Sequence, residues 1–160
     1  MFKVKQEVGG LSTLSSARRA RTQAMRTRPS TRPARGILVV DDEITIRSLL
    51  DTALTREGYP VWLASDGEQA LEVFRIHRNE IALVFLDVRM PVLDGPETLK
   101  ALQRLEPEIR CCFMSGQSGQ YSAEQLLELG AAQVFKKPFR IAEVLEAAER
   151  LTAEVPPKKG

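Results

Sequence analysis

The chain has 160 residues, of which 43% are hydrophobic and 28% are charged, which is enough for one globular domain with a core but too short for two. No apolar run approaches the roughly 18 residues of a membrane span, so we expect no membrane partner. One histidine and two adjacent cysteines, Cys111 and Cys112, provide neither a His-based zinc cluster nor a disulfide framework, so we expect a cytoplasmic protein.

The N-terminal segment differs in charge from the rest of the chain. Residues 1–35 contain nine Lys or Arg and one acidic residue, a net charge of +8. Residues 36–160 contain 14 basic and 20 acidic residues, a net charge of −6. The first segment has no apolar periodicity that could offset the entropy lost on ordering, so we predict a basic, disordered tail over residues 1–35.

Four explanations for this tail remain open. The first is a solvated tail without a specific role, and the second is an extension from a start codon placed too early, with Met25 as the true start. The third is a segment that binds an acidic partner or nucleic acid weakly through its charge. The fourth is an organelle transit peptide. Apart from this weak electrostatic contact, we expect no nucleic-acid partner. Residues 153–160, which include two adjacent prolines, are predicted to be a second disordered tail.

Between the tails, five short apolar segments alternate with five amphipathic segments. The apolar segments, which we predict to be strands, are 37–40, 61–64, 81–86, 111–114 and 134–135. Apolar residues at helical spacing follow them around 46–54, 70–74, 99–105, 123–129 and 141–148. Strands that are apolar throughout, each followed by a helix, require a parallel sheet covered by helices on both faces. The pattern therefore predicts one α/β domain over residues 36–152.

Polar side chains stand at the carboxyl ends of four of these strands, where open parallel sheets bind their ligands. Asp41 and Asp42 follow the first strand, Asp87 the third, Ser115 the fourth and Lys137 the fifth. Three neighbouring carboxylates repel one another, so we expect at least one raised pKa unless a cation compensates. Carboxylate oxygens are preferred ligands of Mg²⁺, so this ion and the lysine are the natural compensators.

In their order and spacing, these residues resemble the receiver domain of two-component response regulators. The resemblance runs from about residue 36 to 151 and includes the segment 86–95, Ser115-Gly116, Gly130-Ala131 and the segment 137–139. It implies a flavodoxin-like, doubly wound parallel sheet of five strands in the order 2-1-3-4-5, with five helices. It also implies a stand-alone receiver, because about nine residues follow Leu151.

The resemblance further implies a role for each polar residue. Asp87 would accept a phosphoryl group from a histidine kinase or phosphotransfer protein, Ser115 would hydrogen-bond that group and Lys137 would pair with it. The ligands of Mg²⁺ would be Asp41, Asp42, Asp87 and the backbone carbonyl of Arg89. Phosphorylation would then switch binding to a downstream protein target, so the chain would be a self-phosphorylating and self-dephosphorylating signalling domain rather than a turnover enzyme.

The chain departs from the family pattern at one position. Val134 stands where most receivers have Tyr or Phe, and Phe135 is expected on the opposite face of its strand, so we expect the aromatic switch to be missing or altered, with Tyr121 as its candidate replacement. Separately, Arg89 and Gln117 occupy positions that tune dephosphorylation in the family. Neither is acidic, so we predict a longer phosphoryl lifetime than in receivers with an acid at these positions.

Other functions remain open. A phosphorylation-independent, receiver-like interaction module is disfavoured because all five site positions are filled. A phosphatase of the aspartyl-phosphate type has an Asp-x-Asp pattern after its first strand, whereas Asp41 and Asp42 are contiguous. These two residues could also merely cap the helix that follows them.

Overall fold

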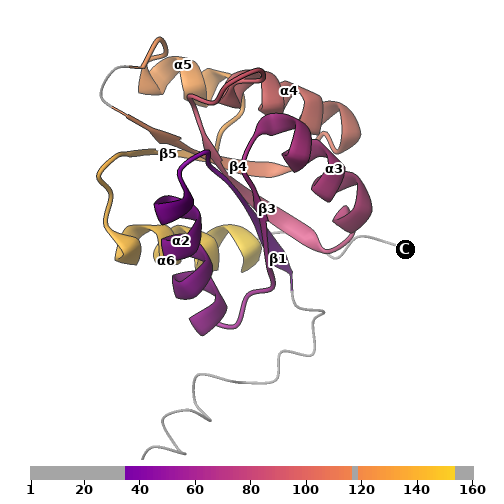
Figure 1. Cartoon of the computed structure of the whole chain (residues 1–160), viewed down its shortest axis with the longest axis vertical. Coiled ribbons are helices and arrows are strands. Elements are labelled where there is room, and N and C mark those ends of the chain that lie inside the picture. The colour runs from indigo at the N-terminus through magenta and orange to yellow at the C-terminus, as the bar shows by residue number, and fades with distance from the viewer. Residues whose placement is uncertain (1–34, 117–118, 154–160) are drawn as a thin grey trace, which may run out of the picture. The chain divides into compact units, whose positions relative to one another are not determined.

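The computed structural model describes residues 35–116 and 119–153, in which five strands alternate with five helices (Figure 1). In chain order these are β1 (Gly36–Val40), α2 (Ile44–Arg56), β2 (Val61–Ala64), α3 (Gly67–His77), β3 (Ile81–Asp87), α4 (Gly95–Leu105), β4 (Arg110–Ser115), α5 (Ala123–Glu128), β5 (Gln133–Lys136) and α6 (Ile141–Ala153). The predicted tails over residues 1–35 and 153–160 lie, except for their innermost residues, outside the described part. Within it, no helix combines the length and apolar character needed to cross a bilayer.

The strands form one parallel sheet in the order β2-β1-β3-β4-β5, which confirms the predicted α/β class, strand order and five helices. Val40 at the end of β1 pairs with Leu86 of β3, and Asp87 pairs with Met114 of β4. Ser115, which ends β4, pairs with Lys136 of β5. This register brings the carboxyl ends of four strands to the same edge of the sheet.

Helices cover both faces of the sheet, α2 and α6 on one face and α3, α4 and α5 on the other (Figure 1). Each face has its own buried cluster of apolar side chains, because alternate residues of every strand point to opposite faces. Cys111 and Cys112 illustrate this division. Both are fully buried, Cys111 under α3, α4 and α5 and Cys112 under α2 and α6.

The helices on the second face begin at side-chain caps. Asp66 accepts a hydrogen bond from the Gln69 backbone N–H at the start of α3. Asp94 and Ser122 form capping boxes at the starts of α4 and α5, each exchanging hydrogen bonds with the residue three positions later. These caps fix the starts of α3, α4 and α5 at the edge of the sheet where the strands end.

Candidate functional site

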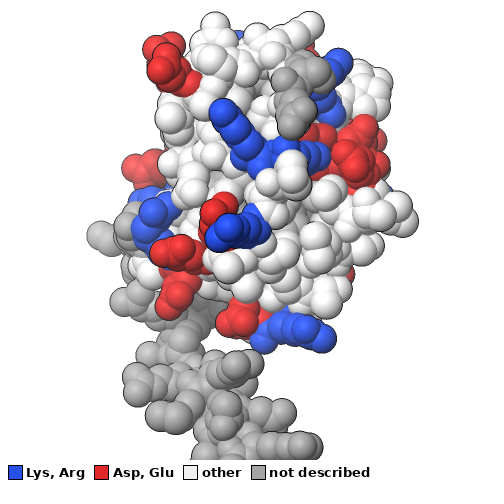
Figure 2. All heavy atoms as spheres, turned by 90° about the vertical axis from the view of Figure 1, so that its left-hand side faces the viewer, with Lys and Arg blue, Asp and Glu red and all other residues white. Residues whose placement is uncertain are grey.

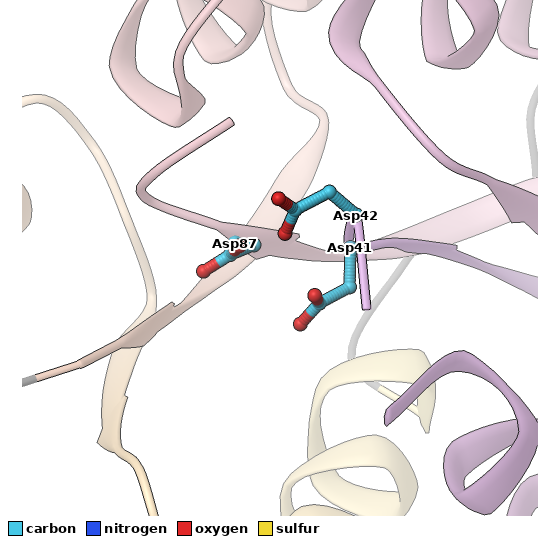
Figure 3. A group of neighbouring side chains, drawn as sticks. All are labelled: Asp41, Asp42 and Asp87. Carbon is cyan, nitrogen blue, oxygen red and sulfur yellow. The ribbon is translucent and has the colours of Figure 1, made fainter. Parts of the chain in front are cut away.

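Three aspartates gather where β1 and β3 end. Asp41 and Asp42 follow β1 directly, and Asp87 is the last residue of β3. One carboxylate oxygen from each lies within 4.8 Å of the others, and Figure 3 shows the three side chains grouped at these strand ends. Asp41 and Asp87 are buried, whereas Asp42 is exposed to solvent. The structure thus brings together the three acids singled out from the sequence.

Asp41 is held on several sides. The Glu43 backbone N–H donates to its Oδ1 at 2.9 Å, and the Arg47 guanidinium donates to its backbone carbonyl at 2.6 Å. The N-cap residue of α2 is Glu43, which makes no side-chain cap, so neither Asp41 nor Asp42 is the N-cap of that helix. Asp41 is therefore fixed as a buried carboxylate at the strand end, and its second oxygen remains for another partner.

Lys137 supplies that partner. Its Nζ lies 2.8 Å from Asp41 Oδ2, 3.3 Å from Asp87 Oδ1 and 3.6 Å from Glu43 Oε1. The side chain is only 16% exposed, whereas the neighbouring Lys136 is exposed. Lys137 follows β5 and precedes a cis peptide bond to Pro138. As expected, the lysine next to the proline, and not Lys136, is the one that reaches the acids.

The site carries more negative charge than one lysine neutralises. Burial and the neighbouring Asp41 carboxylate raise the pKa of Asp87 to about 7, although Lys137 works in the opposite direction. Burial also raises the pKa of Asp41. Burial alone would lower the pKa of Lys137, but its contacts with Asp41 and Asp87 raise that pKa overall. The expected raised carboxyl pKa is confirmed, with burial a larger cause than repulsion.

This donor set fits a small, hard divalent cation. Three carboxylates offer oxygen ligands within reach of one ion, and their uncompensated charge favours its binding. The exposed Asp42 also lines an open cleft of about 350 Å³ beside the site, through which an ion and water can reach the acids. Arg89 lines the same cleft, together with Val88, Met90, Pro91, Asp94, Gln120 and Tyr121.

Ser115 lies at the same edge but is not joined to the acids by a hydrogen bond. It ends β4 and is 8% exposed, and its hydroxyl donates to the Gly116 carbonyl at 3.3 Å. The Lys137 backbone N–H donates to the Ser115 carbonyl at 2.8 Å, which ties the ends of β4 and β5 together. The hydroxyl would have to turn away from Gly116 to face a group on Asp87.

Gly95, the first residue of α4, lies directly behind Asp87. A Cβ atom at this position would stand 2.4 Å from the Asp87 carbonyl oxygen and 2.8 Å from the Val88 Cα. The Gly95 N–H donates to the Val88 carbonyl at 2.9 Å. The start of α4 is thus pressed against the backbone that carries Asp87, an approach that only glycine permits without displacement.

Two side chains at the site were not predicted. Arg47 contacts Asp41, and Glu43 contacts both Asp41 and Lys137, but nothing in their spacing distinguishes them from other charged residues at an exposed helix start.

Val134 and Phe135 lie on opposite faces of β5, as expected. Val134 packs against the cluster under α3, α4 and α5, whereas Phe135 is buried on the other face. Gln117 lies outside the described residues.

Comparison with known proteins identifies the family of the chain. The model of the response regulator receiver domain family matches residues 37–149. Sporulation initiation phosphotransferase F of Bacillus subtilis is 37% identical over 114 residues, which are 71% of this chain and 90% of that protein. The alkaline phosphatase synthesis transcriptional regulatory protein PhoP of the same organism is 40% identical over 108 residues, 68% of this chain but only 44% of PhoP.

A solved structure shares the fold. CheY of Borrelia burgdorferi, in a complex with CheX, BeF₃ and Mg²⁺, superposes with a TM-score of 0.67 and 28% identity over 72% of this chain and 87% of that chain. Two findings establish the family of the chain. One family model matches residues 37–149, and one relative is matched over 90% of its own length. The chain belongs to the response regulator receiver domains of two-component signal transduction.

Proposed function

We propose that the chain is a phosphoacceptor that takes a phosphoryl group on Asp87 from a phosphohistidine of a histidine kinase or phosphotransfer protein. The observation that carries this proposal is the convergence of Asp41, Asp42 and Asp87 within 4.8 Å, with the Lys137 ammonium 3.3 Å from Asp87 Oδ1. Asp87 is the central member of this group, because it lies at the sheet edge between Asp41 and the end of β4.

The transfer is a substitution at phosphorus. A carboxylate oxygen of Asp87 forms the new P–O bond while the P–N bond of the phosphohistidine breaks, and the electron pair of that bond returns to the imidazole, which takes up a proton. The product is an acyl phosphate. Lys137 lies where it can pair with the phosphoryl oxygens, and Ser115 can donate its hydroxyl to them after turning from Gly116. Self-dephosphorylation is the hydrolysis of the same acyl phosphate by water.

Asp41, Asp42 and Asp87, with the backbone carbonyl of Arg89, are the groups that would hold Mg²⁺. When bound, the ion would offset the negative charge that accumulates between the carboxylates and the phosphoryl group. The fit rests on the chemistry of the donors: two buried acids that a single lysine leaves partly unneutralised, and one exposed acid open to the cleft. The solved complex of a similar protein with BeF₃ and Mg²⁺ supports this assignment.

The test is phosphorylation of the full chain by acetyl phosphate with Mg²⁺. A mass gain of about 80 Da is expected, the mass of one phosphoryl group, and it should be lost in Asp87→Asn and on removal of Mg²⁺. Asp51→Asn is the matched control, because Asp51 lies on α2 away from the three acids, and it should be labelled like the wild type. Absence of an adduct on the wild type would favour the phosphorylation-independent module instead.

The partners follow from the same chemistry. We infer a histidine kinase or phosphotransfer protein as the donor, and a downstream protein as the target of the phosphorylated form. We place these reactions in the cytoplasm, a reducing compartment, because both cysteines are free thiols. Catalytic turnover of small phosphate esters, rather than a single transfer, would contradict the assignment as a signalling domain.

A further inference from the structure

The side chain of Tyr121 bridges two segments that flank the acidic site. Its hydroxyl donates to Asp94 Oδ2 at 3.4 Å, across 27 residues of sequence. Tyr121 stands immediately before the N-cap of α5, and Asp94 is the N-cap of α4, so the bridge joins the starts of two helices. The ring packs partly buried against the core under α3, α4 and α5. The Asp94 charge raises the pKa of Tyr121.

Asp94 is a fixed anchor for this bridge. Its Oδ1 accepts from the Glu97 N–H and its own N–H donates to Glu97 Oε2, both at 2.9 Å. Its carbonyl accepts from the buried Thr98 hydroxyl at 2.7 Å. The next residue, Gly95, lies against the Asp87 carbonyl. Asp94 therefore has little freedom relative to the end of β3, and Oδ2 is the oxygen left for Tyr121.

Tyr121 is also packed close to Ser115. Gly119 lies between them, because a Cβ atom on Gly119 would stand 3.4 Å from Ser115 Oγ and 3.5 Å from the Tyr121 carbonyl oxygen. The Ser115 hydroxyl is turned toward the Gly116 carbonyl. A turn of this hydroxyl away from Gly116 would take place beside Gly119, which stands between Ser115 Oγ and the Tyr121 backbone.

We propose that the Tyr121–Asp94 bridge holds Gly119, which lies beside Ser115, in its resting position and so opposes capture of a phosphoryl group on Asp87. This inference rests on the proposed function and adds a restraint to it. Tyr121 is a positioning residue, because it acts through Ser115 and touches none of the reacting atoms. A ligand that requires the shifted arrangement binds more weakly when the resting arrangement is stabilised, so loss of the bridge should strengthen its binding.

The test measures the apparent affinity for beryllofluoride, a phosphoryl analogue, by thermal-shift titration of the full chain at fixed Mg²⁺. Tyr121→Phe removes only the hydroxyl, and the affinity should rise about threefold, the size expected for one weak hydrogen bond. Asp94→Ser keeps a capping oxygen but is too short for the bridge, and it should have the same effect. The double variant should gain no more than either single variant, because both remove the same contact.

Tyr59→Phe is the matched control, since Tyr59 is the other tyrosine and packs against the core on the opposite face of the sheet. It should leave the beryllofluoride affinity unchanged, and Tyr121→Phe should leave the Mg²⁺ affinity unchanged. An unchanged or weakened beryllofluoride affinity in Tyr121→Phe, or additive effects in the double variant, would overturn the restraint. A wild-type chain that binds no beryllofluoride and takes no phosphoryl group from acetyl phosphate would instead refute the proposed function.

Discussion

At the scale of single residues, Asp87 combines burial with nearby negative charge, and the folded protein therefore stabilises its neutral form. A carboxyl group in the unfolded chain ionises near its ordinary pKa of 3.8, whereas the pKa of Asp87 is raised to about 7 in the fold. Because the folded pKa lies above the unfolded one, the free energy of unfolding falls as pH rises between these values. Above about pH 7 the full cost of the buried charge remains.

We therefore expect Asp87→Asn to stabilise the metal-free protein at pH 8, by about 2 kcal/mol, since the amide carries no charge. The gain should shrink toward pH 5, where Asp87 of the wild type is protonated. Adding Mg²⁺ should stabilise the wild type more than the variant if the ion binds the folded state through this carboxylate, as proposed. Urea unfolding at both pH values, with a chelator or with Mg²⁺, measures these differences. A variant less stable than the wild type at pH 8 without metal would contradict the expectation.

Gly95 gives a second prediction at this scale. Alanine normally stabilises a helix relative to glycine, but here its Cβ would lie 2.4 Å from the Asp87 carbonyl oxygen. We expect Gly95→Ala to lower the free energy of unfolding by about 1–3 kcal/mol, the usual cost of overpacking. Gly116→Ala is the control, because a Cβ there meets no atom of the described residues within 4 Å, and its effect in urea unfolding should be small. Equal effects of the two substitutions would disprove the steric argument.

At the scale of the elements, α2 buries the apolar side chains of one face in the core and exposes those of its other face to solvent. Leu50 and Leu54 are fully buried against the sheet, one helical turn apart, whereas Leu49 is 47% exposed and Ile44 is 68% exposed. The buried pair holds the helix on the sheet, while Arg47 ties its first turn to the Asp41 carbonyl. Packing of α2 thus helps to fix the position of the first acidic residue.

Truncation of the buried and the exposed leucine should therefore differ. Leu50→Ala is expected to lower the free energy of unfolding by about 2–5 kcal/mol, through lost burial and a cavity under the helix. Leu49→Ala, the same chemical change one residue earlier, should cost much less, about 0.5 kcal/mol, because about half of Leu49 is exposed to solvent. Chemical denaturation compares the two variants. Similar losses would mean that the face of α2 toward the core is wrongly assigned.

The sequence predicted the elements well where side-chain periodicity controls them, and less well elsewhere. Short continuous apolar runs revealed all five strands, because the middle residues of each strand are apolar and polar residues stand mainly at the strand ends. β5 was predicted over 134–135 but extends from Gln133 to Lys136, since backbone pairing with β4 continues beyond the apolar residues. The contact of Tyr121 with Asp94 could not be predicted, because it joins residues 27 positions apart in the sequence. The contact of Arg47 with the Asp41 carbonyl is local, but it depends on a side-chain direction that only the packed structure sets.

At the scale of the whole molecule, all assigned site residues lie between 41 and 137, within the segment matched by the receiver family at 37–149. The positive charge of the first 35 residues is not needed to explain the site. On the face shown in Figure 2, acidic and basic side chains are interspersed among wide uncharged areas, so the negative charge of residues 36–160 is not gathered there.

Deletion of residues 1–34 should therefore leave phosphorylation by acetyl phosphate unchanged. The free energy of unfolding of the remaining chain should stay within about 0.5 kcal/mol of that of the full chain, because the deleted segment precedes residues 37–149, which the receiver family matches. Mass spectrometry and urea unfolding of both proteins provide the comparison. A loss of labelling on deletion would assign the segment a direct part in the reaction.

The two adjacent cysteines, one on each face of the sheet, have a practical consequence. Both thiols are fully buried, and burial raises the pKa of Cys112 to about 12 and also raises the pKa of Cys111 well above its ordinary value. In the native protein neither should react with an alkylating reagent, because the reactive thiolate is scarce and shielded. In a variant that keeps only Cys112, alkylation would report local unfolding of α2 and α6 from the sheet. In a variant that keeps only Cys111, it would report local unfolding of α3, α4 and α5. Comparison of the two alkylation rates would show how independently the two helical layers open.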